Sequence, residues 1–421
     1  MQDNIIIRTT ADQKVFDWWV DLEVHLMLDT VASNATFSTF ITDDNKHLFK
    51  PGVCTECTIE VYNSSTGSYE TLITGIIMQT AFSIQKEPGV DSVVVVSKSY
   101  IIQNVPVPRE FYSVQFKGMS LKSIARKLCE YYGLELFVHD GAFFDASIKY
   151  KQDASLVNVG EKYKTPTAEE KEESDIPEAD KDFKKFQAKE GESVYSFLVR
   201  LAKERGITVA HDNLGRVMLY KILNVIVATS EVSEESSSVI SMKFTPNWQN
   251  MHSSITARCE SAEGEDETVE NTPCEYTAES PFHRGITMRN VSKTSQSAIL
   301  STENTKLYKQ PKIVVAGNID PSELKEYADS LVCKEAKNFP VVLEWDGWFM
   351  PDIKNGGLRS VRAGFFLWVS MESRFIKRTQ MVIEDMHFSK KSKDENYKVV
   401  ATCVHPCVYT GKIPTETIFI D

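Results

Sequence analysis

The chain has 421 residues, of which 42% are hydrophobic and 25% are charged, and its formal net charge is −12. This length predicts about two to four domains of a globular protein, and the acidic balance excludes general DNA binding through phosphate neutralisation. An acidic wall is still compatible with passive passage of DNA. No apolar run reaches about 18 residues, and no signal-peptide pattern begins the sequence. We therefore expect that the chain does not insert stably into a membrane. We also expect that it is synthesised in a cytoplasm and that its cysteines are reduced.

Residues 5–110 have the pattern of β-strands. Segments 18–42, 55–82 and 91–105 are rich in β-branched and aromatic residues, and parts of them alternate between apolar and polar positions. Turn-forming residues at Asn63–Gly67 separate two strand-like runs. The first part of the chain is therefore predicted to be an antiparallel β-domain.

A helix–glycine–strand unit follows and occurs twice, 73 residues apart. Each copy has a serine suited to the N-cap, an apolar face with helical spacing, and a glycine suited to the C-terminal end. The matched positions are Gly118, Ser120, Leu121, Ile124, Ala125, Leu128 and Gly133 in the first copy, and Gly191, Ser193, Val194, Phe197, Leu198, Leu201 and Gly206 in the second. The repeat indicates packing rather than catalysis.

Three acidic segments, 161–182, 229–238 and 259–280, contain few large apolar residues. Such segments bury too little surface to offset their ordering entropy, so they are interpreted as exposed insertions. Sites for a cation or for a partner are the alternative.

Strand-like segments return after about residue 239, and a helix is predicted over 321–338, with Asp320 as N-cap and Pro321 in the first turn. The predicted fold class is α+β and mainly β. Its domains are a first β-domain (1–115), an α/β insertion (116–225) and a second, mainly antiparallel β-domain (226–421).

Candidate metal ligands are few. Cys54 and Cys57 have C-x-x-C spacing but lead into a strand, and a zinc site would require them to meet Cys403, His405 and Cys407 in the distant second β-domain. Ordinary strand cysteines are the preferred interpretation, so no metal or cofactor is predicted.

Candidate catalytic residues are equally sparse. His139–Asp140 and His211–Asp212 suggest a base with an orienting acid, but the sequence places no nucleophile beside them, and loop residues are the simpler interpretation. Gly356–Gly357 matches no phosphate-binding fingerprint. No catalytic residue is assigned, and the chain is predicted not to be an enzyme.

The most conspicuous aromatic cluster is Trp345-Asp346-Gly347-Trp348. Aromatic platforms that stack nucleic-acid bases are accompanied by basic neighbours, whereas here the neighbours are Glu344 and Asp346. Packing in a core or an interface is therefore predicted.

With this order of elements, the chain resembles the baseplate hub proteins of Mu-like contractile-tailed phages, including the late-control proteins and the hub portion of type VI secretion spike proteins. The resemblance is carried by LITGIIMQTAF (72–82), with its T-G-x-I core, by the two helix–glycine–strand units (118–138 and 186–221), and by segments 328–352 and 362–389. The acidic insertions after Lys151 and Arg258 and the turn before Pro311 depart from the pattern.

The resemblance implies a structural virion protein, synthesised in the host cytoplasm and located in the tail baseplate. Each chain of a homotrimer would supply two tube-like antiparallel β-barrels, so that a ring of six modules joins the tail tube to the central spike. The implied partners are the tail tube, other baseplate proteins and a separate spike chain, with DNA passing through the channel. The alternative is a tail-associated protein that binds or hydrolyses peptidoglycan through the LysM-like outline of residues 116–225.

Overall fold

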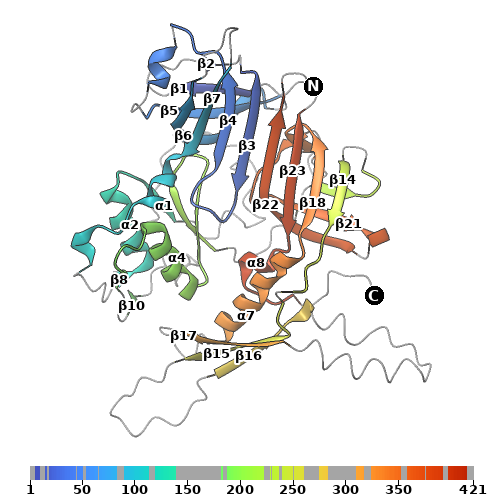
Figure 1. Cartoon of the computed structure of the whole chain (residues 1–421). Coiled ribbons are helices and arrows are strands. Elements are labelled where there is room, and N and C mark those ends of the chain that lie inside the picture. Colours follow the sequence, from blue (N-terminus) through green and yellow to red (C-terminus); the bar gives the residue numbers. More distant parts are fainter. Residues whose placement is uncertain are drawn as a thin grey trace, which may run out of the picture.

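In the computed structural model, one large β-sheet runs through two halves of the chain and carries two smaller α/β units (Figure 1). The structure describes residues 5–9, 15–16, 19–43, 45–50, 54–64, 66–82, 90–112, 119–138, 182–183, 187–221, 228, 230–236, 239–249, 251–259, 275–282, 310–316, 324–351, 358–374, 376–391 and 397–414.

The first β-domain has the strand order β2-β1-β5-β6-β7-β4-β3. Buried residues alternate with more exposed ones along β3, β4, β5 and β7, which is the period-two pattern of a sheet with one face on a core. The turn predicted at Asn63–Gly67 is confirmed, because Gly67 adopts φ +69° and its N–H donates to the carbonyl of Asn63 (2.8 Å). The strands are β1 (Ile5–Thr9), β2 (Val15–Phe16), β3 (Asp21–Met27), β4 (Asn34–Thr39), β5 (Glu56–Asn63), β6 (Ser68–Ala81) and β7 (Asp91–Ser97).

The second β-domain continues the same sheet. Strand β22 pairs along its C-terminal half with β3, in antiparallel register from Asp385 opposite Met27 to Lys390 opposite Leu22. The order beyond β22 is β23-β18-β14, with β21 and β13 branching from β22. Its strands are β13 (Ser230–Ser233), β14 (Val239–Phe244), β18 (Val341–Asp346), β21 (Phe366–Met371), β22 (Ile376–Lys390) and β23 (Lys398–Val404), and β19 (Phe349–Pro351) pairs with β20 (Leu358–Ser360) beside them.

The closed barrels expected from the resemblance are not present among the described residues. The strand pairings of the large sheet follow an open path from β14 to β2, with a branch through β21 to β13. The predicted α+β, mainly β fold class is therefore confirmed, whereas closure of the sheet into barrels is not. Barrel closure requires pairing between strands that are distant in sequence. Apolar alternation assigns the buried face of each strand but does not specify that distant partner.

The insertion contains both predicted helices. Helix α2 (Leu121–Tyr131) begins at N-cap Ser120 and α4 (Val194–Glu204) at N-cap Ser193, and each serine accepts a hydrogen bond from the backbone N–H three residues later. Gly133 and Gly206, which follow the helices, have positive φ. Its other elements are β8 (Met119–Ser120), β9 (Leu136–Val138), β10 (Asp182–Phe183), β11 (Thr208–His211) and β12 (Val217–Tyr220). Helix α1 (Ile101–Asn104) and 3₁₀ turns at Lys98–Tyr100 and Arg109–Phe111 precede the insertion in the chain.

Two segments that carry the resemblance meet where the insertion contacts the first β-domain: the T-G-x-I segment of β6 and the turn between β11 and β12 in the second repeated unit. The N–H of Thr74 donates to the carbonyl of Asn213 (2.8 Å), and the side-chain amide of Asn213 donates to the carbonyl of Thr71 (3.1 Å). Gly215 has φ +75°, and a Cβ atom there would lie 2.5 Å from the carbonyl oxygen of Thr74. A Cβ at Gly75 would lie 2.2 Å from the carbonyl oxygen of Val96 on β7. Both glycines therefore allow backbones to approach closely.

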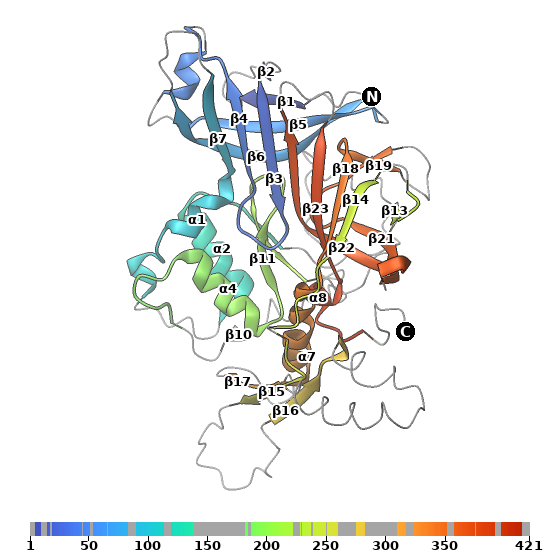
Figure 2. The ribbon, with the colours of Figure 1, turned by 45° about the vertical axis from the view of Figure 1, so that its right-hand side comes forward.

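The last part of the chain also contains a second, small α/β unit. Strands β15 (Ser254–Cys259), β16 (Glu275–Glu279) and β17 (Pro311–Ala316) form their own sheet, in which β15 and β17 are parallel. Helix α7 (Leu324–Lys334) covers one face of this sheet, and Figure 2 shows the unit at the end of the molecule away from the first β-domain. The predicted helix over 321–338 is therefore present as α7 and a following 3₁₀ turn, Glu335–Asn338 (η8), whereas Asp320 and Pro321 lie outside the described residues.

The acidic segments include two strands. Ser230–Ser233 is β13, in which Val232 is buried and Glu231 pairs with Arg378 through two contacts of 2.9 Å, so the loop expected at 229–238 is partly wrong. Glu275–Glu279 is β16, so the loop expected at 259–280 is also partly wrong. Residues 161–181 and 260–274 lie outside the described residues.

Candidate functional site

His211, one of the two histidines considered as a base, is buried between the insertion and the loop that follows β3. Its Nδ1 lies 2.8 Å from the carbonyl oxygen of Thr30 and its Nε2 lies 2.7 Å from Oγ of Ser33. A carbonyl oxygen only accepts, so Nδ1 carries the proton and Nε2 accepts from the Ser33 hydroxyl. The Ser33 oxygen in turn accepts from the N–H of Met27 (3.2 Å).

This serine–histidine pair is arranged like a catalytic pair, but its role is structural, because it connects the insertion to the loop that follows β3. The Asp212 carboxylate does not orient the imidazole; it accepts from Nε of Arg216 (2.5 Å) and from the N–H groups of Leu214 and Arg216. Burial lowers the pKa of His211, which keeps the ring neutral. Ser33 and His211 are 3% and 9% exposed, so a substrate cannot reach them. His139 and Asp140 lie outside the described residues.

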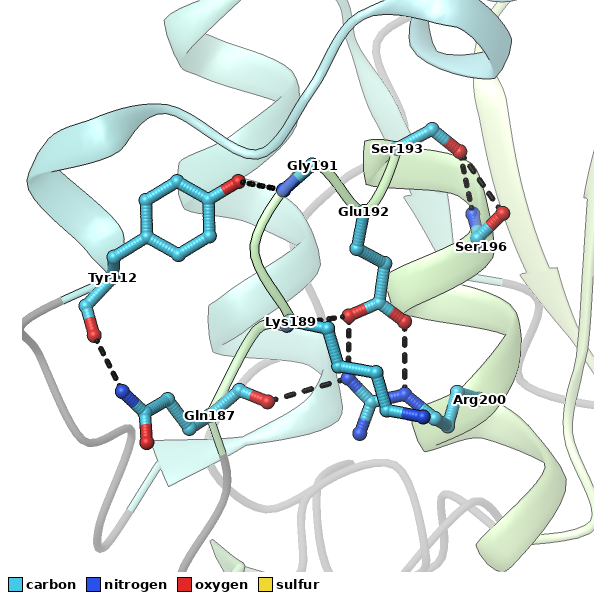
Figure 3. Close-up of polar contacts among 8 residues, drawn as sticks. All are labelled: Tyr112, Gln187, Lys189, Gly191, Glu192, Ser193, Ser196 and Arg200. Carbon is cyan, nitrogen blue, oxygen red and sulfur yellow. Dashed lines mark hydrogen bonds and ion pairs between the residues drawn. The ribbon is translucent and has the colours of Figure 1, made fainter.

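The segment Gly191-Glu192-Ser193, a G-E-S motif directly before α4 in the second repeated unit, takes part in an internal network (Figure 3). Arg200 donates to both carboxylate oxygens of Glu192 (2.8 and 2.5 Å), and Glu192 also accepts from the N–H of Lys189 (2.9 Å). Burial acts to raise the pKa of Glu192, but the contacts with Arg200 and Lys189 outweigh it and hold that pKa below its ordinary value. Glu192 is therefore an ionised structural partner of Arg200 and is not suited to serve as a general acid.

The rest of the motif fixes the start of α4 (Figure 3). The N–H of Gly191 donates to the hydroxyl of Tyr112 (3.0 Å), and the residue has φ +74°. The Ser193 hydroxyl accepts from the N–H of Ser196 (3.2 Å), while Gln187 donates to the carbonyl of Tyr112 (3.0 Å). The motif therefore has local structural reasons for its three residues: Gly191 adopts a positive φ, Glu192 pairs with Arg200, and Ser193 caps α4.

The seam between the two β-domains contains a histidine–carboxylate cluster. His25 on β3 lies directly opposite His387 on β22, with the rings edge-on at 5.7 Å between centroids. Nε2 of His25 lies 2.8 and 2.9 Å from the two carboxylate oxygens of Asp385. The hydrogen bond to Asp385 raises the pKa of His25, against a smaller opposing effect of burial. The seam is therefore stabilised by a charge that depends on pH.

Substituting His25 with glutamine is expected to remove a pH-dependent part of the stability. Because the folded-state pKa is raised, the contribution of His25 is fully present below the unfolded-state value of 6.5 and is lost as the pH rises through the folded-state value. The unfolding midpoint of the wild type should therefore lie above that of His25→Gln, and this difference should be larger at about pH 6 than at about pH 8.5. His47→Gln, at an exposed histidine outside the seam, is the control. A difference between wild type and His25→Gln that stays constant with pH contradicts the assignment.

A second charged junction joins both β-domains to the small α/β unit. Nζ of Lys337, in η8, contacts the carboxylates of Asp29 and Glu384, and it lies 5.5 Å from the ring centroid of Tyr409 in α8 (Cys407–Thr410). The Tyr409 hydroxyl donates to Glu384 (2.9 Å). Burial acts to lower the pKa of Lys337, but Glu384 and Asp29 outweigh it and raise that pKa. The ammonium group thus holds together three parts of the chain.

Substituting Lys337 with methionine leaves the Asp29 and Glu384 carboxylates without their shared cation. We expect a loss of about 1–2 kcal/mol of unfolding free energy, below the cost of breaking a fully buried pair because the lysine is partly exposed. Chemical denaturation measures the loss. Lys46→Met, which breaks the exposed pair with Asp43, is the control and should have no measurable effect. Equal effects of the two substitutions contradict a special role for Lys337.

The candidate metal ligands are not assembled into a site. Cys57 is buried on β5, where burial raises its pKa to about 12, and Cys54 is exposed. Burial lowers the pKa of His405 to about 4, and its Nδ1 accepts from the N–H of Cys407 (3.1 Å). Within the described ranges, no three or more histidine, cysteine or acidic side chains are grouped to hold a metal ion.

The aromatic cluster has the packing role predicted for it. Trp345 and Trp348 are 1% and 0% exposed and belong to the core of the large sheet. The ring of Trp348 lies 5.0 Å from that of Phe388 on β22. Base stacking needs an accessible ring face, so these tryptophans do not form a nucleic-acid platform.

Three strands of the large sheet are paired on one side only among the described strands: β13 on its branch, and β14 and β2 at the two ends of the main strand order. The last two are the strands that we consider for contact with another chain. At one end β14 pairs only with β18, and at the other β2 pairs only with β1, among the described strands. Ile240 on β14 is 56% exposed and Val15 on β2 is 42% exposed. Unpaired edges with exposed apolar residues are suited to continuing a sheet into a neighbouring molecule. In the described part of the chain, no helix is both long and apolar enough to cross a membrane.

Comparison with known proteins gives the fold. No protein-family model matches the sequence, and no curated protein matches it significantly. Among solved structures, the chain is similar to the 43 kDa tail protein of prophage MuSo2 from Shewanella oneidensis (16% identity, TM-score 0.63, covering 97% of this chain and 99% of that one). It is also similar to a tail protein from Neisseria meningitidis MC58 (13% identity, TM-score 0.63, covering 98% and 99%). The chain therefore has the fold of Mu-like phage tail proteins, as the sequence resemblance predicts.

Proposed function

We propose that the chain is a structural subunit of a phage baseplate hub, which forms a homotrimer and joins the tail tube to the central spike. The observation that carries this proposal is the β3–β22 junction, where two β-domains of one chain lie side by side in a continuous sheet. Three such chains would place six β-domains in a circle. This arrangement matches a six-fold tube on one side and a three-fold spike on the other.

The contacts between subunits would use the ends of the large sheet. In a closed ring each subunit presents one surface to the next and a different surface to the previous one. Strands β14 and β2 are different edges at opposite ends of the strand order, which is the arrangement that such a head-to-tail contact requires. We therefore propose that β14 of one chain lies against the β1–β2 edge of its neighbour.

The remaining parts of the proposal concern domains, partners and location. Residues 1–115 and 226–421 would be the tube-like domains and 116–225 the insertion between them. The partner at the centre of the ring would be a spike on a separate chain. The net charge of −12 suits a channel wall that repels DNA and lets it pass. The protein would be located in the virion and would have no enzymatic activity.

The mass in solution tests this function. Light scattering of the purified chain should give three times the 47.6 kDa chain mass. A monomer at micromolar concentration, or a monomer that cleaves peptidoglycan, contradicts the hub and favours the alternative function. That alternative places activity in 116–225, where the carboxylates of Glu192 and Asp212 are each paired with an arginine.

A further inference from the structure

A pocket of about 480 Å³ lies where the second α/β unit meets the turn η8. A pocket of this volume is large enough for a small ligand or for one or two side chains of a partner. Its walls come from the segment before β15, from β15, β17 and α7, and from η8. The lining residues are Gln249, His252, Ile255, Lys312, Leu331, Lys334, Glu335, Lys337 and Asn338.

The pocket has an excess of positive charge in a chain that is acidic overall. No carboxylate of the described residues pairs with Lys334 or with Lys312, whereas Lys337 is turned to Asp29 and Glu384. Burial, followed by the like charges of Lys203 and Lys337, lowers the pKa of Lys334. An anion bound beside Lys334 would relieve both effects.

The single acid in the pocket wall does not supply that anion. Glu335 directs one oxygen to Nδ1 of His252 (2.5 Å) and the other to the N–H of the same residue (2.8 Å). Its carboxylate is therefore already paired with His252, and this contact holds the segment before β15 against η8. The cations of the wall remain in excess.

We propose that this pocket binds the carboxylate group of an acidic ligand, with Lys334 as the main cation and Lys312 at the entrance. The amides of Gln249 and Asn338 provide further donors, and the Ile255 side chain gives an apolar wall for the aliphatic stem of the ligand. An ammonium group attracts a carboxylate as a point charge. The carboxylate comes from a free dicarboxylate or from an acidic side chain of a protein segment, and the proposal does not depend on the trimer.

Isothermal titration calorimetry of the full chain tests the site with succinate, with a short polyglutamate peptide and with inorganic phosphate. We expect succinate or the peptide to bind, and the tighter of the two identifies the source of the carboxylate. Lys334→Met should weaken that binding at least about tenfold, because a charged hydrogen-bond partner is lost. Lys334→Arg should retain most of it.

Lys325→Met is the matched control and should bind as the wild type does. It removes one lysine from the same helix at an exposed position nine residues away, which places it on the opposite face. Lys312→Met, at an exposed position of β17, should weaken binding severalfold and tests the site independently of the fold around Lys334. The proposal is overturned if neither carboxylate probe binds, if phosphate binds as tightly as both, or if Lys334→Met and Lys312→Met leave the affinity unchanged.

Discussion

Substituting Ile240 with lysine is expected to convert the proposed trimer into monomers. Ile240 is 56% exposed on β14, at one end of the large sheet, where the proposed ring places the neighbouring chain. A lysine there would have to lose its hydration at each of the three contacts, while in the monomer it remains in water. We expect the concentration for half-dissociation to rise at least about tenfold, as measured by light scattering over a dilution series.

Ile313→Lys is the control for this substitution. Ile313 is 59% exposed on β17, which belongs to the small sheet and not to the large one. It should therefore leave the oligomeric state unchanged, and both variants should keep the unfolding midpoint of the isolated chain. A trimer that survives Ile240→Lys contradicts the assignment of β14 as the contact edge.

Substituting Gly215 with alanine is expected to cause a large loss of stability. The new Cβ would meet the carbonyl oxygen of Thr74 at 2.5 Å, and the residue would be held at φ +75°. Because the atom that it meets is backbone, either β6 or the Asn213–Gly215 turn must move. We expect a loss of about 3 kcal/mol, measured by chemical denaturation.

Gly67→Ala is the control that separates the two causes of this stability loss, which are the steric clash of the new Cβ and the unfavourable positive φ. Gly67 has φ +69°, but nothing lies within 4 Å of a Cβ atom there. Its substitution should cost only the conformational penalty of about 1–2 kcal/mol. If the two variants lose equal stability, the close approach between Gly215 and Thr74 does not contribute to holding the insertion on the first β-domain.

The elements that the sequence predicts best are those whose signals are local. Ser120 and Ser193 cap their helices within three residues, and the apolar faces follow from helical spacing, so α2 and α4 are found from short windows. The strands of the first β-domain are predicted for the same reason, because alternation along a single strand marks its buried face.

The features that the sequence does not predict depend on distant partners. β15 and β17 are separated by residues 260–310, and nothing in either strand indicates that they pair in parallel with each other rather than with the large sheet. The contact of His211 with Ser33 spans 178 positions, and the pocket around Lys334 is formed by segments from Gln249 to Asn338. Apolar pattern gives the face of a strand, whereas its partner depends on the packing of the whole molecule.

The charged residues that join the parts of the chain could not be predicted from the sequence either. Lys337, Asp29 and Glu384 have no special spacing in the sequence, yet they meet where three parts of the chain join. Charged residues on such segments are indistinguishable from solvated surface residues until the fold is known. The sequence could therefore indicate the class of protein through its motifs, but not the contacts that join its domains.

Images of single particles of the purified chain test the central claim most directly. Averaged views along the symmetry axis should show a ring of six similar lobes around an open channel, with threefold symmetry and a pair of lobes from each chain. Particles of one or two lobes without a ring, or a ring in which each chain contributes one lobe, contradict the claim that the two β-domains of one chain tile a closed hub.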